Sequence, residues 1–383
     1  MKSERLFNIL SEIDSELLAD AENISPRKHR RPLRTIAAAA SLFLILGTGS
    51  YLYNNRPDPS LPKLTIDFYE NGGMGFSGYW AYDISELVNN NPWTEDCTLT
   101  HLPVFRNRHP VDGAGTLIEF DWEFMNAALT KVAGYLGINN LEITHDPDGI
   151  SGPPVSAQAQ GMYFRMYHPE VTEVFFDPLV NLPEEYQIAG ISSTYEDNYT
   201  LAEYLLEMYP NLIPMENPTI NIYGGDYSSD GTENWQDYSI SFYDVTEDLT
   251  QNILNYNFNL TTFTPDIETG NLWIYRVYQQ DLHDVIGYYP IISADEAQSL
   301  LCKGYYGTNV PEDFRGEEYI AKRELVYRND IMQDIYVPYY LFYVELPQEY
   351  KKNGLKDYGL YYVPAIESKY IEDFPQVWNI HFN

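Results

Sequence analysis

The stretch DWEFMNAALTKVAGYL (residues 121–136) shows the pattern on which the fold of this chain depends. Four apolar residues in it recur every three or four positions: Phe124, Ala128, Val132 and Tyr135. Such spacing places side chains on one face of a helix. Two strand-like runs follow, NLEITH (140–145) and GMYFRMYH (161–168). The sequence therefore predicts a helix followed by two strands.

The same order recurs along the rest of the chain. Helical patterns at 200–208, 248–256 and 293–301 are each followed by two or three Tyr-rich, strand-like runs. Hairpin-linked strands with helices on one face are typical of an antiparallel α+β architecture, whereas a parallel doubly wound sheet alternates single strands with helices. We therefore expect an α+β fold built from repeated helix–strand–strand units.

The clearest helix start lies in ISADEAQSLL (292–301), where Ser293 can cap the helix and Glu296 can close a capping box. Together with PYYLFYVELP (338–347) and YGLYYVPAI (358–366), this motif resembles the PepSY-type module and its YycH/YycI relatives. The resemblance covers residues 288–366. It implies a small extracytoplasmic α+β module used for inhibition or for regulating membrane kinases and proteases.

An uncharged stretch lies near the N-terminus, at residues 35–55. A helix over residues 35–53 would be roughly 28 Å long, close to the ~30 Å hydrocarbon thickness of a bilayer. We therefore expect a single transmembrane helix that acts as a signal anchor. Two alternatives stay open, a cleaved signal peptide with GTG (47–49) as a weak cleavage site and a soluble core helix.

The charges on the two sides of this stretch are unequal. Five basic residues precede it, whereas only Arg56 closely follows it. Because basic residues are retained on the cytoplasmic side, we expect a cytoplasmic N-terminus and an extracytoplasmic C-terminal region at the cell membrane. The residues expected to set this topology are Arg27, Lys28, Arg30, Arg31 and Arg34.

The leader, residues 1–34, contains an amphipathic helical pattern with an acidic polar face. Its apolar stripe is formed by Leu6, Ile9, Leu10, Ile13 and Leu17. Helices that lie on the inner leaflet usually carry Lys and Arg, so we favour a cytosolic protein partner over an interfacial position. The leader also resembles those of single-span membrane proteins of Gram-positive bacteria encoded beside extracytoplasmic-function sigma factors, which implies a regulator.

The composition limits the function of the rest of the chain. The leader has seven Lys/Arg and six Asp/Glu, which leaves 16 Lys/Arg and 50 Asp/Glu for residues 35–383. A region so acidic lacks the basic footprint of a nucleic-acid-binding protein. Its 35 Tyr argue against disorder. Beyond the span we expect a Pro-rich spacer (54–62) and two α+β regions, at 63–245 and 246–383.

Catalytic and metal-binding motifs are sparse. The sequence contains no HExxH or Gly-x-Ser-x-Gly motif, and its seven His stand at no metal-ligand spacing. Cys97 and Cys302 make a disulfide an open question. The loop GGDYSSDGTENWQD offers oxygen ligands that suit calcium, the one cofactor we consider. Its candidate ligands are Asp226, Asp230, Glu233 and Asp237, with an acidic hairpin loop as the alternative.

These features favour a membrane-anchored extracytoplasmic binding or sensing protein without catalytic activity. We expect it to regulate a signalling partner in a sigma-factor or kinase system. An anchored cell-wall hydrolase is the enzymatic alternative, supported only by the expected location and by the abundance of Tyr and carboxylates. A passive surface-binding protein is the third hypothesis.

Overall fold

The computed structural model describes residues 60–66, 78–111, 117–147, 152–229, 234–311, 313–347, 354–372 and 379–381. All of them belong to one compact unit, Pro57–Asn383. Strands dominate these residues, and they form three sheets.

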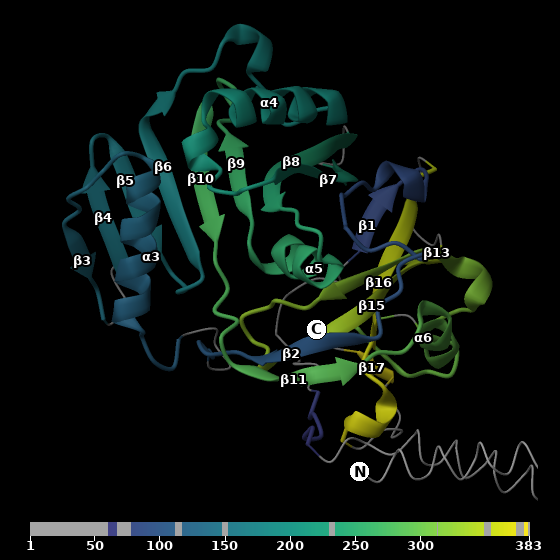
Figure 1. The fold of residues 1–383 in the computed structure, drawn as a ribbon. Helices are drawn as coiled ribbons and strands as arrows, with labels where there is room; N and C mark the ends of the chain where they lie inside the picture. Colours follow the sequence, from purple (N-terminus) through teal and green to yellow (C-terminus); the bar gives the residue numbers. More distant parts are fainter. Residues whose placement is uncertain are drawn as a thin grey trace, which may run out of the picture. The chain divides into compact units, whose positions relative to one another are not determined.

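The largest sheet has eight antiparallel strands in the order β3-β4-β5-β6-β10-β9-β8-β7 (Figure 1). The strands are β3 (Ile143–His145), β4 (Val155–Ala159), β5 (Met162–Met166), β6 (Val171–Val180), β10 (Leu272–Tyr278), β9 (Thr261–Pro265), β8 (Asn234–Asp244) and β7 (Pro218–Ser229). The pairing of β6 with β10 joins segments that are about a hundred residues apart in sequence. The short β3 forms one edge of the sheet and the long β7 forms the other.

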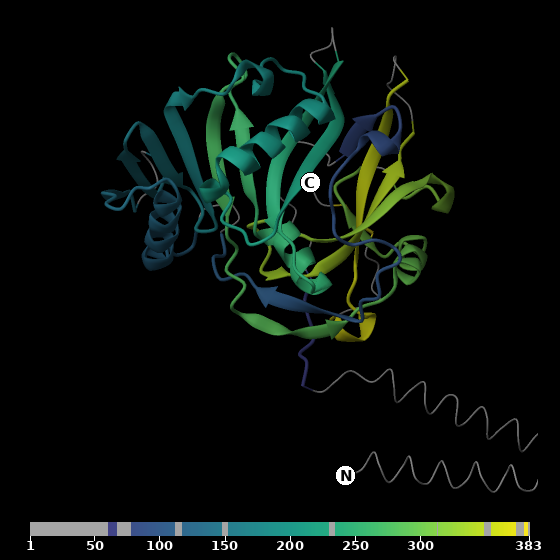
Figure 2. The same cartoon turned by 45° about the horizontal axis from the view of Figure 1, so that its top comes forward.

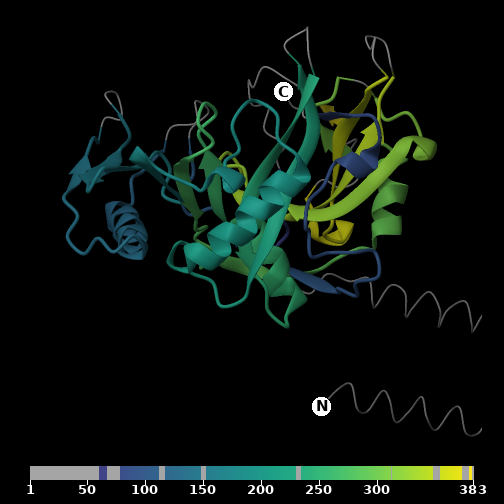
Figure 3. The ribbon, with the colours of Figure 1, turned by 90° about the horizontal axis from the view of Figure 1, so that it is seen from above.

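Helices α3 (Trp122–Tyr135) and α4 (Tyr195–Met208) cover one face of this sheet (Figures 1 and 3). Asp121 caps α3, and Thr194 and Asp197 form a capping box at the start of α4. The buried faces of both helices pack on apolar side chains of the sheet, among them Phe164, Phe242 and Tyr275. This cluster is the larger core of the molecule.

Two smaller sheets complete the fold. The first has six strands: β13 (Ile320–Tyr327), β15 (Pro338–Glu345), β16 (Lys356–Pro364), β12 (Tyr306–Thr308), β17 (Asn379–His381) and β1 (Gly78–Ala81). The second has three: β11 (Val285–Pro290), β2 (His101–Arg106) and β14 (Ile335–Tyr336). In the six-stranded sheet β1 pairs with β16, and β1 also contacts β7 of the large sheet (Figure 2).

Two further helices and five short 3₁₀ turns connect these layers. Helix α5 (Leu249–Phe258) contacts β8 of the large sheet and β13 of the six-stranded sheet, and α6 (Ala294–Leu301) packs on β16. The turns are η1 (Ile84–Glu86), η2 (Glu184–Tyr186), η3 (Pro210–Leu212), η4 (Glu317–Tyr319) and η5 (Ser368–Tyr370). Helix α5 thus lies between the two larger sheets.

The expected fold class, an α+β fold built from helix–strand–strand units behind a transmembrane helix, is wrong. The described residues contain seventeen strands and only four α-helices. The repeats are not structural units, because strands that follow α3, α4 and α5 all join the same eight-stranded sheet. Pairing between distant strands, rather than the local helix–strand order, decides which strands share a sheet.

The description as a transmembrane, signal-anchored membrane protein is also corrected. No helix among the described residues is long and apolar enough to cross a membrane. Residues 35–53, on which that expectation was placed, lie outside the part of the chain that the structure describes.

Several local expectations are confirmed. The capping box of Ser293 and Glu296 is present at the start of α6, and the other helical patterns coincide with α3, α4 and α5. The open question of a disulfide is answered by the structure, in which Cys97 and Cys302 are both free thiols. The division at residue 245 stays a prediction, although strands from both sides of it share the large sheet.

Candidate functional site

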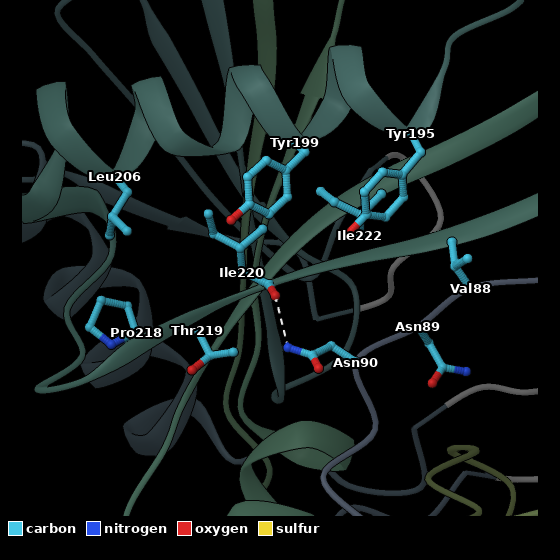
Figure 4. Close-up of a pocket in the computed structure, with 10 residues that line it drawn as sticks. All are labelled: Val88, Asn89, Asn90, Tyr195, Tyr199, Leu206, Pro218, Thr219, Ile220 and Ile222. Carbon is cyan, nitrogen blue, oxygen red and sulfur yellow. Dashed lines mark hydrogen bonds between the residues drawn. The ribbon is translucent and has the colours of Figure 1, made fainter.

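A groove lies between helix α4 and the edge strand β7 (Figure 4). Its volume is about 520 Å³. Helix α4 contributes one wall, β7 contributes the floor, and the segment 88–90 contributes the opposite wall. The lining residues are Val88, Asn89, Asn90, Tyr195, Tyr199, Leu206, Pro218, Thr219, Ile220 and Ile222.

The segment 88–90 is held against the edge of β7 by backbone hydrogen bonds. Val88 N–H donates to Gly224 O (3.0 Å), and Gly224 N–H donates to Val88 O (3.2 Å). Two residues further on, Asn90 Nδ2 donates to Ile220 O (3.1 Å), and Asn90 N–H donates to Asn221 Oδ1 (2.7 Å). The segment therefore covers the edge of β7 at Gly224 and meets it again at Ile220.

The backbone of Ile222 lies between these two contacts. In an antiparallel pair the direction of the backbone hydrogen-bonding groups alternates along the strand. The backbone groups of Gly224 and Ile220 point away from β8, toward the segment 88–90. Because Ile222 lies two residues from each of them, its backbone N–H and C=O also point away from β8. The N–H and C=O of Ile222 thus point toward the groove, whereas Asn221 and Tyr223 pair with β8.

Two glycines permit close approaches to β7, Gly225 to the covering segment and Gly224 to β8. Gly225 has a φ of 91°, and a Cβ placed on it would lie 2.0 Å from Glu86 O. Gly224 has a φ of 127°, and its Cβ would lie 2.3 Å from Asp237 O. Any larger residue at either position would strain the backbone. At Gly225 it would also push Glu86 away from β7, and at Gly224 it would push β8 away from β7.

The same segment is also fixed to the six-stranded sheet. Asn89 Nδ2 donates to Glu324 Oε1 (2.8 Å), a carboxylate that is only 5% exposed. Lys322 Nζ pairs with Glu324 at 2.7 Å, and Tyr343 Oη donates to it at 3.0 Å. The carboxylate of Glu324 is buried although Lys322 is 27% exposed, and removing a partner of a buried carboxylate leaves an uncompensated charge, which is destabilising. This wall of the groove is therefore held rigidly by both sheets.

Helix α4 presents an aromatic wall. Tyr195, Tyr199 and Leu206 follow at spacings of four and seven residues, which places them on one helical face. The rings of Tyr195 and Tyr199 stack with a centroid distance of 6.0 Å. Exposed Glu203 lies on the same stripe, four residues after Tyr199 and three before Leu206. The groove thus has an apolar wall with an acidic rim.

The lining residues carry no carboxylate, amine, thiol or imidazole group. Their polar groups are hydroxyls, side-chain amides and the backbone of β7. Such a site offers hydrogen bonds and apolar contacts, but these lining residues include none of the side chains that usually act as general acid or base, such as His, Asp, Glu or Lys. Its geometry suits binding.

The structure places only part of the predicted calcium site. Asp226 on β7 and Asp237 on β8 are cross-strand partners, and Asp226 is half-buried. Burial raises the pKa of Asp226, and repulsion from Asp237 adds to this effect. Asp230 and Glu233 lie outside the described residues. Within the described ranges no group of three or more His, Cys, Asp or Glu can hold a metal ion, and calcium binding by the whole loop stays a prediction.

The other predicted site residues all belong to the leader and the basic cluster. These positions lie outside the part of the chain that the structure describes: Leu6, Ile9, Leu10, Ile13, Leu17, Arg27, Lys28, Arg30, Arg31 and Arg34. Their roles in partner binding and topology stay predictions.

A cluster of buried titratable groups was missed by the sequence analysis. His109, the neighbouring pair His168 and Glu170, and Asp281 come from three separate segments, and each residue is less than 9% exposed. His168 Nδ1 lies 3.5 Å from Glu170 Oε2, and His109 Nε2 lies 3.8 Å from Asp281 Oδ2. Gln280 donates hydrogen bonds to both Glu170 and Tyr336. No spacing in the sequence brings His109 and Asp281 to the pair His168–Glu170, because that contact depends on the packing of the large sheet against β2 and β14.

Burial sets the protonation of this cluster. It raises the pKa of Glu170 to about 8 and lowers the pKa of His168 to about 4. At neutral pH the folded protein therefore holds Glu170 protonated and His168 neutral, which avoids two unsolvated charges.

The groove's signals in the sequence were likewise overlooked. Three consecutive asparagines, Asn89 to Asn91, precede Pro92. Their side-chain amides donate hydrogen bonds to Glu324, to Ile220 O and to Leu325 O, respectively. Short amide side chains in a loop are suited to such contacts with neighbouring backbone. No protein-family model matches the chain, and no curated protein matches it significantly.

The facing aspartates give a direct test of the calcium prediction. Without calcium, Asp237→Asn should raise the free energy of unfolding by about 0.2–1 kcal/mol, because it removes like-charge repulsion across the strands. Calcium bound by the loop should stabilise the wild type and should stabilise the variant less. Urea unfolding with a chelator and with added calcium measures both effects, with Glu207→Gln, an exposed acid on α4, as the control. An unfolding midpoint of the wild type that is unchanged by calcium would contradict calcium binding.

The buried cluster predicts a specific pH dependence. Glu170 has a raised pKa, so its contribution to stability is full below about pH 4.5 and is lost as the pH rises through 8. His168 has a lowered pKa, so its contribution is full above pH 6.5 and is lost as the pH falls through 4. Of these two residues, only Glu170 changes the free energy of unfolding between pH 6.5 and 8, and it lowers it by up to about 1.4 kcal/mol per pH unit.

Glu170→Gln should remove that loss. Relative to the wild type, the variant should gain roughly 1–2 kcal/mol of stability between pH 6.5 and 8, as measured by urea unfolding at the two pH values. Equal pH dependence of the two proteins would show that Glu170 is ionised in the folded state.

Proposed function

We propose that this chain is a non-catalytic binding protein whose groove takes an extended peptide as an added strand on β7. The observation that supports this proposal most directly is the direction of the Ile222 backbone, which turns its N–H and C=O toward the groove. An edge strand with such groups is a template for pairing with another chain. Strand addition of this kind gives affinity through main-chain hydrogen bonds and specificity through pockets for alternate side chains.

The dimensions of the groove limit the length of the peptide. The floor runs from Pro218 to Ile222, and a strand rises about 3.3 Å per residue, so the floor is roughly 13 Å long. The carbonyl of Ile220 within it already accepts a hydrogen bond from Asn90. This length accommodates three or four residues of an extended segment.

The walls specify the side chains that such a peptide should carry. Successive side chains of a strand point to opposite sides, so every second residue faces Tyr195, Tyr199 and Leu206. These positions favour apolar side chains. A basic residue next to them would meet Glu203 at the rim, in a chain whose net charge is −33.

A regulatory role follows from this type of site. Peptide capture at a helix–strand groove recognises a segment of a partner protein rather than a small metabolite. This agrees with the signalling regulator expected from the sequence, and the partner's segment would be apolar at alternate positions with basic flanks.

The peptide Lys-Val-Thr-Val-Thr-Val-Lys, blocked at both ends, tests the proposal by calorimetry with the full chain. It should bind, and a version with alternate amides N-methylated should not, because strand addition needs those N–H groups. Tyr199→Ala should weaken binding about tenfold, since truncating a buried aromatic contact typically costs more than 1 kcal/mol. Tyr288→Ala, an exposed tyrosine on β11, serves as the matched control. Equal binding of both peptides would exclude strand addition.

A further inference from the structure

The face of the large sheet opposite α3 and α4 carries an ordered set of side chains around β5, β6 and β10. Strand pairing places Tyr163, Phe175 and Ile274 in one cross-strand row. The next row holds Arg165, Glu173 and Arg276. Since side chains of a strand alternate between faces, both rows project from the side that the two helices leave uncovered.

The charged row forms a shared ion pair. Arg165 Nε contacts Glu173 Oε2 and Arg276 Nε contacts Glu173 Oε1, each at 2.6 Å. Arg276 Nη1 also donates to Thr264 Oγ1 at 3.0 Å. Within the described part of the chain, the two terminal nitrogens of Arg165 and the Nη2 of Arg276 donate to no other residue. The arginine side chains are 30% and 24% exposed, so part of each side chain is in contact with solvent.

Aromatic side chains surround Arg165. The guanidinium of Arg165 lies 4.3 Å from the centroid of Phe175 and 5.2 Å from that of Tyr167. Trp273 packs edge-on against Phe175, with a centroid distance of 5.8 Å. Trp273 is 41% exposed and Tyr167 is 54% exposed. Stacking on aromatic rings holds the guanidinium of Arg165 in place.

The charge of this face is unusual for the protein. The chain has 56 Asp and Glu against 23 Lys and Arg. On the uncovered face of β4, β5, β6, β10 and β9, however, the strand residues include two arginines and two acids, Glu173 and Asp177. Asp177 lies four residues along β6 from Glu173, roughly 13 Å away at about 3.3 Å per residue. At physiological ionic strength charges more than about 8 Å away are largely screened, so a ligand on this face meets a local positive charge.

We propose that this face, which we call the Arg165–Arg276 platform, binds an acidic oligosaccharide whose sugar rings carry carboxylates. The platform consists of Arg165, Glu173, Arg276, Phe175, Trp273 and Tyr167. A sugar carboxylate accepts hydrogen bonds from the remaining donors of the two arginines, which are the preferred partners of planar carboxylates. The apolar face of a neighbouring sugar ring packs on the exposed Trp273, whose large rigid surface suits such contact.

This proposal rests on residues other than those of the groove. The platform lies on the uncovered face of β5, β6 and β10, whereas the groove lies at the edge strand β7. Loss of peptide binding in a Tyr199 variant therefore leaves sugar binding intact, and failure of one proposal does not affect the other.

The test measures binding of short oligosaccharides of galacturonic acid to the full chain by calorimetry at physiological ionic strength. The methyl esters of the same oligosaccharides keep the rings and remove the charge. The acid form should bind about tenfold or more tightly than the ester, since a hydrogen bond to a charged group contributes about 1.5–3 kcal/mol.

Matched variants locate the site. Trp273→Ala and Arg165→Gln should each weaken binding about tenfold. Trp80→Ala, whose parent side chain is 39% exposed, and Arg106→Gln, which removes an exposed arginine paired with Asp284, should leave it unchanged. Circular dichroism checks that each variant is folded, and Trp273→Phe, which keeps a ring, should bind with intermediate affinity. Equal binding of acid and ester, equal loss in the control variants, or no binding of the acid form would overturn the proposal.

Discussion

The two hydrogen bonds between Val88 and Gly224 determine how the eight-stranded sheet ends. A long edge strand such as β7 exposes a row of backbone donors and acceptors, which proteins must cover or use. Here the segment 86–90 covers one part of the edge. The absence of a side chain at Gly225 allows its close approach, and the hydrogen bond from Asn89 to the buried Glu324 fixes it. The stretch at Ile222, between the contacts at Gly224 and Ile220, lies in the floor of the groove, and among the described residues its backbone N–H and C=O have no hydrogen-bonded strand partner. The same constraint therefore prevents open-ended pairing and creates the binding site.

The fold uses the two faces of the large sheet differently. Helices α3 and α4 bury one face and form the larger core, and α5 with the six-stranded sheet covers part of the other near β8. The remaining area, around Arg165 and Arg276, is left accessible. Near one end of the sheet, the buried pair of His168 and Glu170 is kept neutral by burial, so this junction is most stable in mildly acidic solution.

Local signals in the sequence predicted local structure well. The cap at Ser293, the helical spacing in 121–136 and the Tyr-rich strand patterns all correspond to elements of the fold. The fold class was wrong because strand pairing is non-local: β6 finds its partner β10 about a hundred residues later, and no periodicity encodes that choice. The groove was missed for the same reason, since it needs Asn90, Ile220 and Tyr199 to meet from three distant segments.

The central claim is that Ile222 turns its backbone toward the groove, and amide hydrogen exchange on β7 tests it most directly. In the free protein the Ile222 amide should exchange much faster than the amides of Asn221 and Tyr223, which pair with β8. Addition of a peptide that binds in the groove should slow exchange at Ile222 and leave its two neighbours unchanged. An Ile222 amide as strongly protected as its neighbours in the free protein would contradict the account.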